Sequence, residues 1–316
     1  MIPRGLVEVL CAKNEPLNIS EGSGRLDLAY FIASKDNPLT ARVMANRVWL
    51  KLMGSGLVPT PDNFGIMGQK PSHPELLDYL AVTFMENGWS VKKLIREIML
   101  SRAYQTGSMH DAGNFAKDPD NKFHWRMNQR RLDAEAIRDA MLAVGGVLNL
   151  YPVDGSPVAR AGEGREGLIS LYREVTSKPY TYRSIYLPII RDQIPEVLSV
   201  FDFPDASLVN GDRDTTNVPG QSLFLMNNSQ AQAAADAFAA RLLKFQGTSA
   251  ERLDYAYMLA FGRAPTEAER TAIQNFWMRF PDQAAKGGVP KDKTQFVALS
   301  AFCQGLIASA EFRYLN

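Results

Sequence analysis

Four polar clusters contain the residue types that most often bind ligands or carry out acid/base chemistry. Arg42 and Asn46 are four residues apart and therefore share one face of a predicted helix. Guanidinium groups bind carboxylates and phosphates through paired hydrogen bonds, and carboxylates beside an imidazole can move protons. The clusters fit either a ligand site or a buried polar network. The candidate residues are Arg42, Asn46, Arg47, Asp62, Asn63, His73, Arg131, Asp133, Arg213, Thr216 and Gln221.

His73 is the histidine best suited to chemistry, because two carboxylates, Asp62 and Glu75, lie near it in the sequence. The three side chains could form an acid/base or metal-binding corner. A metal needs about three converging ligands, and the other histidines, His110 and His124, fall in polar segments that we expect to be exposed. His73 also directly precedes a predicted helix, so a capping role is favoured over catalysis. We therefore predict no metal site in this chain.

The run Arg131–Asp139 alternates in charge at helical spacing. One interpretation is a salt-bridged helix face in contact with water. The other is that Arg131 and Asp133 hold the long polar loop 202–220 through paired hydrogen bonds. The salt-bridged helix face is the favoured interpretation, and the second one stays open.

Several classes of protein are excluded by motifs that the sequence lacks. It contains no GxGxxG, no GxxxxGK[ST] and no GxSxG, so a nucleotide-binding fold and a hydrolase elbow are not supported. Its two cysteines, Cys11 and Cys303, form no CxxC pair and are expected to be buried thiols. The net charge of +1 shows no basic excess, so we expect no nucleic-acid partner.

Apolar residues recur at helical spacing along most of the chain, which predicts a mainly α fold with at most a small β element. Segment 184–190 (SIYLPII) is the best strand candidate, because it is β-branched and aromatic, although Pro188 restricts it to a sheet edge. Polar or Gly-rich segments are expected to be loops, namely 57–74, 105–124, 146–183 and 202–220. Thr40 is the expected N-cap of a helix over 41–53.

Two segments of the chain share one helical pattern. RVWLKLMGSGLVPTPDN (47–63) leads to LIREIMLSRAYQ (94–105), and YAYMLAFGRAPTEAE (255–269) leads to FCQGLIASAEFRY (302–314). Ser101 lies 47 positions after Gly54, and Ser309 lies 47 positions after Gly262. The pattern predicts two similar helical hairpin units in which each glycine ends a helix and each serine bonds back to a carbonyl.

The expected organisation is an N-terminal extension over 1–24 followed by one large helical domain over 25–316. Within that domain we expect a first helical unit (25–105), a loop-rich middle (106–228) and a second helical unit (229–316). A site is expected where the loops of the middle meet the segment PTPDNFG (59–65). The second unit replaces that segment with a plain helix, so it is expected to be structural only.

A series of motifs in this chain resembles the PSD1 family (domain of unknown function 1553), which is found in large proteins of planctomycetes and related bacteria. The motifs occur in order along nearly the whole chain. They are SGRLDLAYFIASKDNPLTARVMANRVW, GLVPTPDNFG, PSHPELLDYLA, RRLDAEAIRDAML, RSIYLPI, FDFPD, RDTTNVPGQSLFLMNN and LIASAEFRYLN.

The resemblance implies an exported, multidomain protein, because family members often carry an upstream signal peptide, a haem region like that of cytochrome c and a further module of unknown function. The opening MIPRGLVEVL is not a signal peptide and resembles the join before the domain, so the chain is expected to be a fragment. We therefore expect an extracytoplasmic location, periplasmic or cell-surface, with no haem or other cofactor in this chain. No stretch approaches the ~18–20 apolar residues of a membrane span.

Two functions remain open from the sequence. The favoured one is a binding or assembly module that docks other domains or proteins of the same exported system, or a glycan. The alternative is an extracytoplasmic enzyme acting on polysaccharide, with Asp62, His73, Asp133 and Arg213 around one cleft. The family has no established activity, so the sequence does not decide whether the chain is an enzyme.

Overall fold

A computed structural model gives the fold, and it describes residues 10, 22–155, 157–160, 164–177, 180–190 and 193–315. The described chain is mainly helical, and its only named sheet joins two strands of two residues each, β1 (Arg130–Arg131) and β2 (Tyr314–Leu315). The predicted fold class is therefore confirmed. Cys11 and Ala161–Glu163 lie outside the described residues.

The chain divides into two compact units, one ending at Arg130 and the other spanning Arg131–Leu315. Each unit has its own cluster of buried apolar side chains. The division falls inside the 106–228 stretch that the sequence analysis treats as one loop-rich middle. Whether residues 25–316 fold as a single domain stays a prediction.

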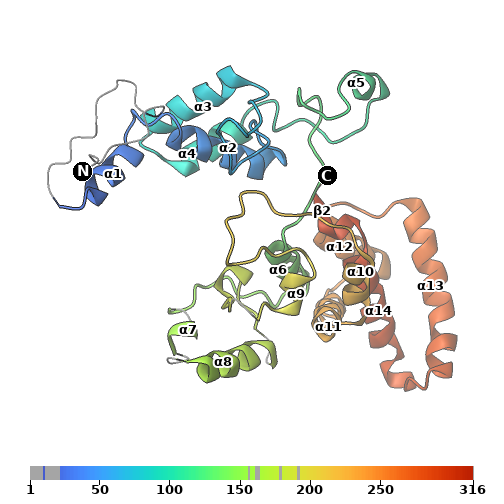
Figure 1. The fold of residues 1–316 in the computed structure, drawn as a ribbon. Helices are drawn as coiled ribbons and strands as arrows, with labels where there is room; N and C mark the ends of the chain where they lie inside the picture. The colour runs from blue at the N-terminus through green and yellow to red at the C-terminus, as the bar shows by residue number, and fades with distance from the viewer. Residues whose placement is uncertain are drawn as a thin grey trace. The chain divides into compact units, whose positions relative to one another are not determined.

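The N-terminal unit is built on three helices that pack together, and it contains two shorter helices, of which the second stands apart from the three (Figure 1). Helix α2 (Thr40–Met53) packs against both α3 (Pro74–Glu86) and α4 (Val91–Met99). The buried face of α2 includes Trp49 and Met53, which meet Leu77, Phe84 and other residues in one apolar core. The remaining helices are α1 (Arg25–Ile32) and α5 (Ala112–Lys117).

Helix α2 begins differently from the expectation. Thr40 is its first residue, and the Thr40 hydroxyl donates to the Ile32 carbonyl at 2.7 Å instead of capping the helix. The cap comes from Asn37, whose buried Oδ1 accepts the backbone N–H groups of Leu39 (2.9 Å) and Thr40 (3.2 Å). Asn37, three residues before the expected cap Thr40, thus satisfies free N–H groups at the start of the helix.

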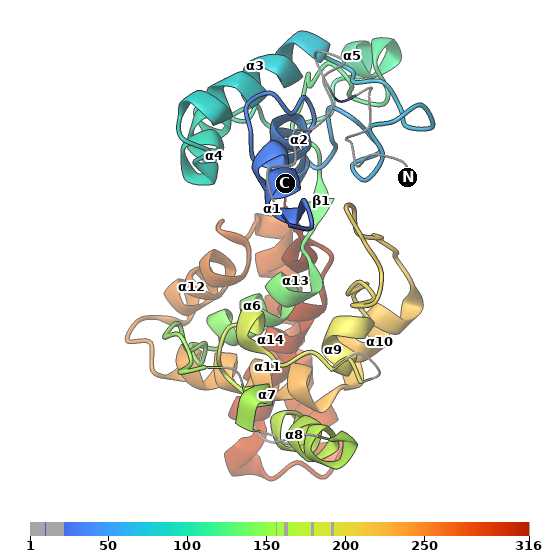
Figure 2. The ribbon, with the colours of Figure 1, turned by 60° about the vertical axis from the view of Figure 1, so that its left-hand side comes forward.

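The C-terminal unit surrounds a central pair of helices, α11 (Ser229–Leu243) and α14 (Thr294–Ala308), which lie side by side (Figures 1 and 2). Phe238 and Ile307 are fully buried within this pair. Small side chains such as Ala235 and Ala239 line α11 and allow close approach to its neighbours. The other helices of this unit are α6 (Ala134–Val144), α7 (Pro157–Arg160), α8 (Arg165–Ser177), α9 (Glu196–Ser199), α10 (Pro219–Asn227), α12 (Ser249–Phe261) and α13 (Glu267–Lys286).

The two predicted hairpin segments share their local geometry. Gly54 and Gly262 both end their helices in the left-handed region, at φ 82° and φ 72°. Ser101 Oγ donates to the Ile98 carbonyl at 2.6 Å, and Ser309 Oγ donates to the Leu306 carbonyl at 2.7 Å. The likeness is local, and a duplicated unit stays a prediction.

Two predictions for 146–190 are wrong. Segment 184–190 is not a strand, because it begins with a short 3-10 helix (Ser184–Tyr186). Both the backbone N–H and the hydroxyl of Ser184 donate to Asp139 Oδ1, at 2.7 and 2.6 Å, and this contact with α6 fixes the segment. The expected loop over 146–183 contains α8, in which Leu168, Leu171 and Tyr172 recur at helical spacing.

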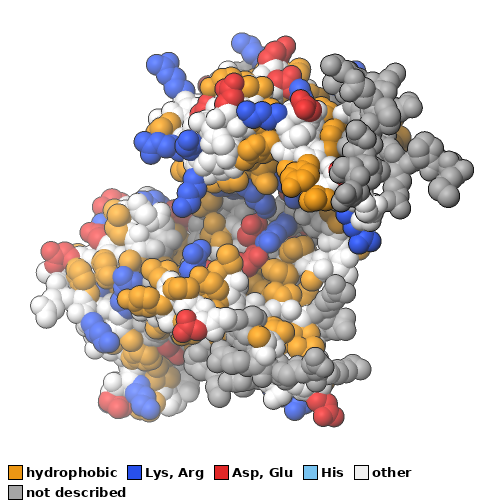
Figure 3. Space-filling view, turned by 90° about the vertical axis from the view of Figure 1, so that its left-hand side faces the viewer, with side chains coloured by type: hydrophobic (Ala, Val, Ile, Leu, Met, Phe, Trp, Pro, Cys, Tyr) orange, Lys and Arg blue, Asp and Glu red, His pale blue; other side chains and the backbone are white. Residues whose placement is uncertain are grey.

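None of the described helices is both long enough and apolar enough to cross a bilayer. Acidic and basic side chains are interspersed on the face drawn in Figure 3, with no large area of one sign. Cys303 is a buried free cysteine, as expected, and burial raises the pKa of its thiol. Such a thiol stays protonated and unreactive near neutral pH.

Candidate ligand pocket

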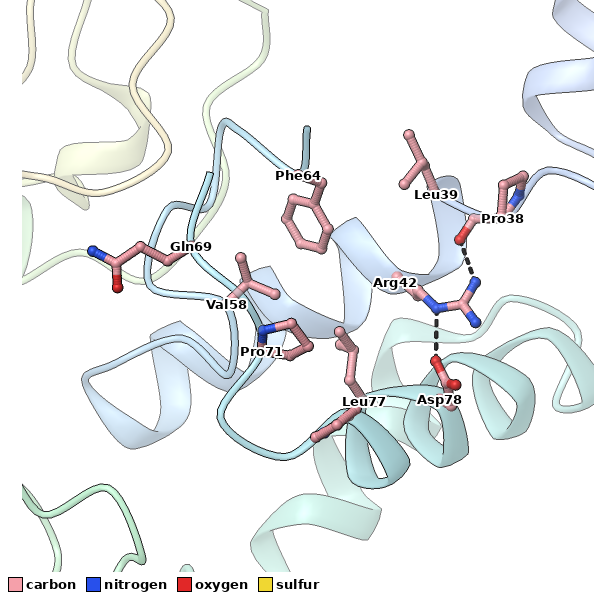
Figure 4. Close-up of a pocket in the computed structure, with 10 residues that line it drawn as sticks. Pro38, Leu39, Arg42, Val58, Phe64, Gln69, Pro71, Leu77 and Asp78 are labelled. Atoms are coloured by element: carbon pink, nitrogen blue, oxygen red, sulfur yellow. Dashed lines mark hydrogen bonds and ion pairs between the residues drawn. The ribbon is translucent and has the colours of Figure 1, made fainter. Parts of the chain in front are cut away.

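The N-terminal unit contains a pocket of about 280 Å³ between α2, the start of α3 and the loop that joins them. Its walls are mainly apolar, and a charged pair stands at one side (Figure 4). All but Gln69 of its lining residues belong to the first three motifs noted above. The lining residues are Pro38, Leu39, Arg42, Val58, Phe64, Gln69, Pro71, Pro74, Leu77 and Asp78.

Arg42 forms the charged side of the pocket together with Asp78. Arg42 Nε donates to Asp78 Oδ1 at 2.6 Å, and Nη1 donates to the Pro38 carbonyl at 2.6 Å. Among the described residues, Arg42 Nη2 and the second carboxylate oxygen of Asp78 have no hydrogen-bond partner. The pocket therefore offers one N–H donor group and one acceptor oxygen beside its apolar walls.

Asn46 holds the loop that forms the far wall of the pocket. Its side chain is fully buried, its Oδ1 accepts the Val58 N–H at 2.8 Å, and its Nδ2 donates to the Val58 carbonyl at 3.0 Å. The Asn46 amide therefore satisfies both the N–H and the C=O of Val58, as the backbone of a neighbouring strand would in a β-sheet. Gly56 lies against the same amide, where an added Cβ would meet Asn46 at 3.1 Å.

Three further contacts fix the same loop. Arg47 Nη2 donates to Asp62 Oδ1 at 2.9 Å on the surface. Asn63 accepts the Gly65 N–H through Oδ1 at 3.0 Å, and its carbonyl accepts the Thr60 hydroxyl at 2.8 Å. These contacts turn the loop so that Phe64, the next residue, lines the pocket. The candidates Asn46, Arg47, Asp62 and Asn63 thus position the pocket and do not line it.

His73 occupies the N-cap position of α3, but its side chain makes no capping hydrogen bond. Its Nδ1 lies 3.0 Å from Ser72 Oγ. Its ring lies 5.9 Å from the ring of His124, which is half-buried and packs edge-on against Trp49 at 5.3 Å. The expectation that His124 is exposed is therefore wrong, because 118–128 folds back onto α2.

The His73 and His124 pair is a packing feature of the N-terminal unit. Burial lowers the pKa of His124, and the neighbouring His73 lowers it further, although Asp118 acts in the opposite direction. His124 is thus held neutral. No group of three His, Cys, Asp or Glu side chains able to hold a metal ion occurs among the residues that the structure describes.

The remaining candidates lie in the C-terminal unit, where they hold the 202–220 loop. Arg131 donates to Asp202 Oδ2 at 2.6 Å, and it also donates to the carbonyls of Phe201 and Thr216. Burial tends to raise the pKa of Asp202, but hydrogen bonds from Arg131 and Thr216 lower it below its usual range. Gln221, fully buried, donates to the Thr216 carbonyl at 3.1 Å. These residues form a polar network in which Arg131 and Gln221 are buried, Asp202 is partly buried and Thr216 is exposed.

Arg213 is held by α6. Its guanidinium makes a two-pronged bond to Glu135, at 2.6 and 3.0 Å, and this bond raises the pKa of Arg213. Asp133 is the N-cap residue of α6 and lies 3.8 Å from Arg213. The 131–139 run therefore contacts loop 202–220 through Arg131, as the second interpretation expects, but Arg131 bonds one Asp202 oxygen and two backbone carbonyls and makes no paired bond to a carboxylate. The paired bond comes from Glu135, a residue outside the candidate set.

The four residues of the predicted acid/base cleft belong to two different units. Asp62 and His73 lie in the N-terminal unit, and Asp133 and Arg213 lie in the C-terminal unit. The enzymatic alternative stays a prediction. No residue of 106–228 lines the pocket in the described chain, so the pocket differs from the site expected at the meeting of those loops with PTPDNFG.

The fold and the pocket together define a helical module with a small apolar pocket shaped by its polar motif residues. A family model described as PSD1, a protein of unknown function (DUF1553), matches residues 24–277, so the chain belongs to this family. The matched range covers the pocket and both units but ends within α13. Comparisons with curated proteins and with solved structures gave no match.

Proposed function

We propose that the N-terminal unit is a binding module whose pocket receives one apolar side chain from an extended segment of a partner protein. The observation that carries this proposal is that the apolar and the polar motif residues have different positions at the pocket. Apolar motif residues line the pocket, whereas Asn46, Arg47 and Asn63 hold its walls from behind. Because the pocket wall is already fixed in the free protein, binding does not have to order the loop, and less conformational entropy is lost.

The size and lining of the pocket support a side chain as its occupant. Pockets for whole small molecules hold about 300–1,000 Å³, and this one holds about 280 Å³. Three prolines, with Leu77 and Phe64, present a rigid apolar surface, as in sites that bind extended peptides. A polysaccharide would instead need several polar partners for its hydroxyl groups.

The charged side of the pocket suits the backbone of such a segment. Arg42 Nη2 can donate to a backbone carbonyl, and the second oxygen of Asp78 can accept a backbone N–H. An extended segment offers both groups next to each side chain. The bound residue would therefore be fixed by two backbone hydrogen bonds and by burial of its side chain.

The location and the partners are part of the proposal, and the family resemblance is what supports them. The module is proposed to lie outside the cytoplasm, within a longer exported protein whose upstream part carries the haem. The partner segment then belongs to another domain or protein of the same exported system.

The proposal is tested by selecting peptides from a random displayed library on the full chain. We expect wild type to enrich peptides that share one apolar residue, and Leu39→Trp, which fills the pocket, to lose at least about tenfold in affinity for them. Leu100→Trp is the matched control, because Leu100 is 63% exposed and does not line the pocket. Equal binding by both variants would contradict the proposal.

A glycan array with the same three proteins separates the peptide proposal from a glycan site. We expect no glycan binding that Leu39→Trp abolishes. If Leu39→Trp removed binding to a glycan and left peptide binding unchanged, the pocket would be a sugar site and the proposal would be wrong.

A further inference from the structure

Two large apolar side chains, Ile66 and Met67, stand at the tip of the loop that joins α2 to α3. Their exposed fractions are 101% and 87%, and Ile66 is the most exposed large apolar residue of the described chain. Single exposed apolar residues are ordinary on a protein surface. The pair therefore gains its meaning from how the chain holds it and from what lies beside it.

The tip is a β-turn that begins at Gly65 and ends at Gly68. The Gly68 N–H donates to the Gly65 carbonyl at 2.9 Å, and the Gly65 N–H donates to Asn63 Oδ1 at 3.0 Å. A Cβ at Gly68 would collide with the Asn63 carbonyl oxygen, so glycine is needed for this close approach. The Thr60 hydroxyl closes the base of the turn, because it accepts the Gln69 N–H at 3.0 Å. The loop therefore holds its two apolar side chains in water in a fixed position.

The turn stands at the rim of the pocket. Phe64 and Gln69, which lie on either side of the turn, both line the pocket (Figure 4). Ile66 is only two residues from Phe64, yet it is fully exposed and does not fill the pocket of its own chain. Because the turn is fixed, Ile66 can enter such a pocket only on another molecule.

A surface that carries both a protruding apolar side chain and an apolar pocket is complementary to itself. In a two-fold symmetric dimer each copy presents the same surface, so each protruding side chain meets the pocket of the other copy. The assembly then closes at two copies. The charged residues of the pocket are Arg42 and Asp78, one of each sign, so the pocket lining has no net charge that would repel a second copy.

We propose that the pocket receives Ile66 of a second copy of this chain, so that two chains form a two-fold symmetric dimer. This inference rests on the proposed function, in which the pocket takes one apolar side chain, and it names a partner. Ile66 suits the pocket better than Met67, because a β-branched side chain loses fewer rotamers on burial.

The backbone of Ile66 also fits the charged side of the pocket. Among the described residues, neither the N–H nor the carbonyl of Ile66 has a hydrogen-bond partner. These are the two groups that Asp78 and Arg42 can bind, and a turn offers them as an extended segment does. A dimer of this kind occupies both pockets, so any other partner segment has to compete with it.

Sedimentation equilibrium of the full chain, from roughly 1 µM to 1 mM, tests the proposal. Two side chains and two pockets make a small interface, so we expect a weak dimer with a Kd of roughly 10–100 µM. Ile66→Ser removes both contacts at once and should weaken the dimer at least about a hundredfold. Leu39→Trp, which fills the pocket, should have the same effect.

The matched controls are Met109→Ser and Leu100→Trp, and both should dimerise as wild type does. Met109 is 87% exposed and Leu100 is 63% exposed, both lie in the same unit, and neither lines the pocket. Because Ile66 is fully exposed, Ile66→Ser should unfold at the Tm of wild type, so loss of the dimer would not reflect loss of the fold.

Peptide binding, measured below the Kd of the dimer, separates this inference from the proposed function. Ile66→Ser keeps its pocket and should bind the selected peptides as wild type does, and excess peptide should dissociate the wild-type dimer. A monomer at every concentration, or a dimer that Ile66→Ser leaves unchanged, would overturn the inference and leave the peptide proposal standing. A dimer lost in both pocket variants, with no peptide selected, would support the second copy and contradict the peptide partner.

Discussion

At the residue scale, Asn46 does the most to shape the pocket. Both of its amide groups are used on one buried residue, Val58, which is 2% exposed. The sequence analysis selected Asn46 because it is a polar residue on a largely apolar helix, and the structure gives it a specific polar contact. The sequence could not show that Asn46 binds the backbone of Val58 instead of a ligand. Loop 54–73 has no periodic pattern from which the course of its backbone could be predicted.

Asn46→Ala should destabilise the N-terminal unit by about 2–6 kcal/mol, because it leaves two buried backbone groups of Val58 without partners at ~1–3 kcal/mol each. Asn63→Ala, at an exposed position, should cost less than about 1 kcal/mol. Urea unfolding followed by tryptophan fluorescence measures both. A similar cost for the two variants would show that Asn46 does not hold the loop.

His124 should make the N-terminal unit less stable in mild acid. Its folded pKa is lowered by burial and by His73, so the unfolded state binds a proton first as pH falls. The stabilising contribution is full above the unfolded pKa of about 6.5 and is lost as pH falls below that value toward the folded pKa.

His124→Asn tests this expectation, because His124 has φ 52° and asparagine tolerates that conformation well. Between pH 8 and pH 5, the free energy of unfolding of wild type should fall more steeply than that of His124→Asn. Parallel curves for the two proteins would contradict the assignment.

At the element scale, loop 202–220 is held at two points of unequal burial. The Arg131 side chain is 3% exposed and bonds Asp202, at the start of the loop, and Thr216. The Arg213 side chain is 25% exposed and bonds Glu135 on α6. Breaking a buried pair costs more than breaking a partly exposed one, because the remaining charge is less hydrated.

Arg131→Met should therefore destabilise the C-terminal unit by about 3–5 kcal/mol, and Arg213→Met by about 1 kcal/mol or less. Limited proteolysis within 204–215 should also be faster in Arg131→Met. Equal stability losses for the two variants would show that the loop is not held mainly by the buried contact.

Elements with a strong local signal could be predicted from the sequence, and elements decided by tertiary contacts could not. Gly54 and Ser101 were placed correctly because helix ends and serine turns depend on nearby backbone. Segment 184–190 has the composition of a strand, but Asp139 accepts two hydrogen bonds from Ser184, and this tertiary contact outweighs the local strand preference. The pocket walls were missed, because Pro38 and Leu77 carry no polar chemistry that marks them as a site.

At the scale of the whole molecule, the two units have separate apolar cores, each with a buried phenylalanine. Phe84, in the N-terminal unit, is 3% exposed, and Phe238, in the C-terminal unit, is 0% exposed. Phe84→Ala and Phe238→Ala should each cost about 3–5 kcal/mol. Calorimetry should show that each variant lowers a different transition, and a single transition lowered equally by both would contradict separate cores.

The central claim is that the motif residues of the N-terminal unit build a pocket for one apolar side chain. The most direct measurement is the Kd of one selected peptide for wild type, Leu39→Trp and Leu100→Trp, with the shared apolar residue of the peptide intact or replaced by alanine. The alanine peptide and Leu39→Trp should each weaken binding at least about tenfold, and together they should weaken it little further, because both remove the same contact. Additive losses, or no loss with Leu39→Trp, would contradict the claim.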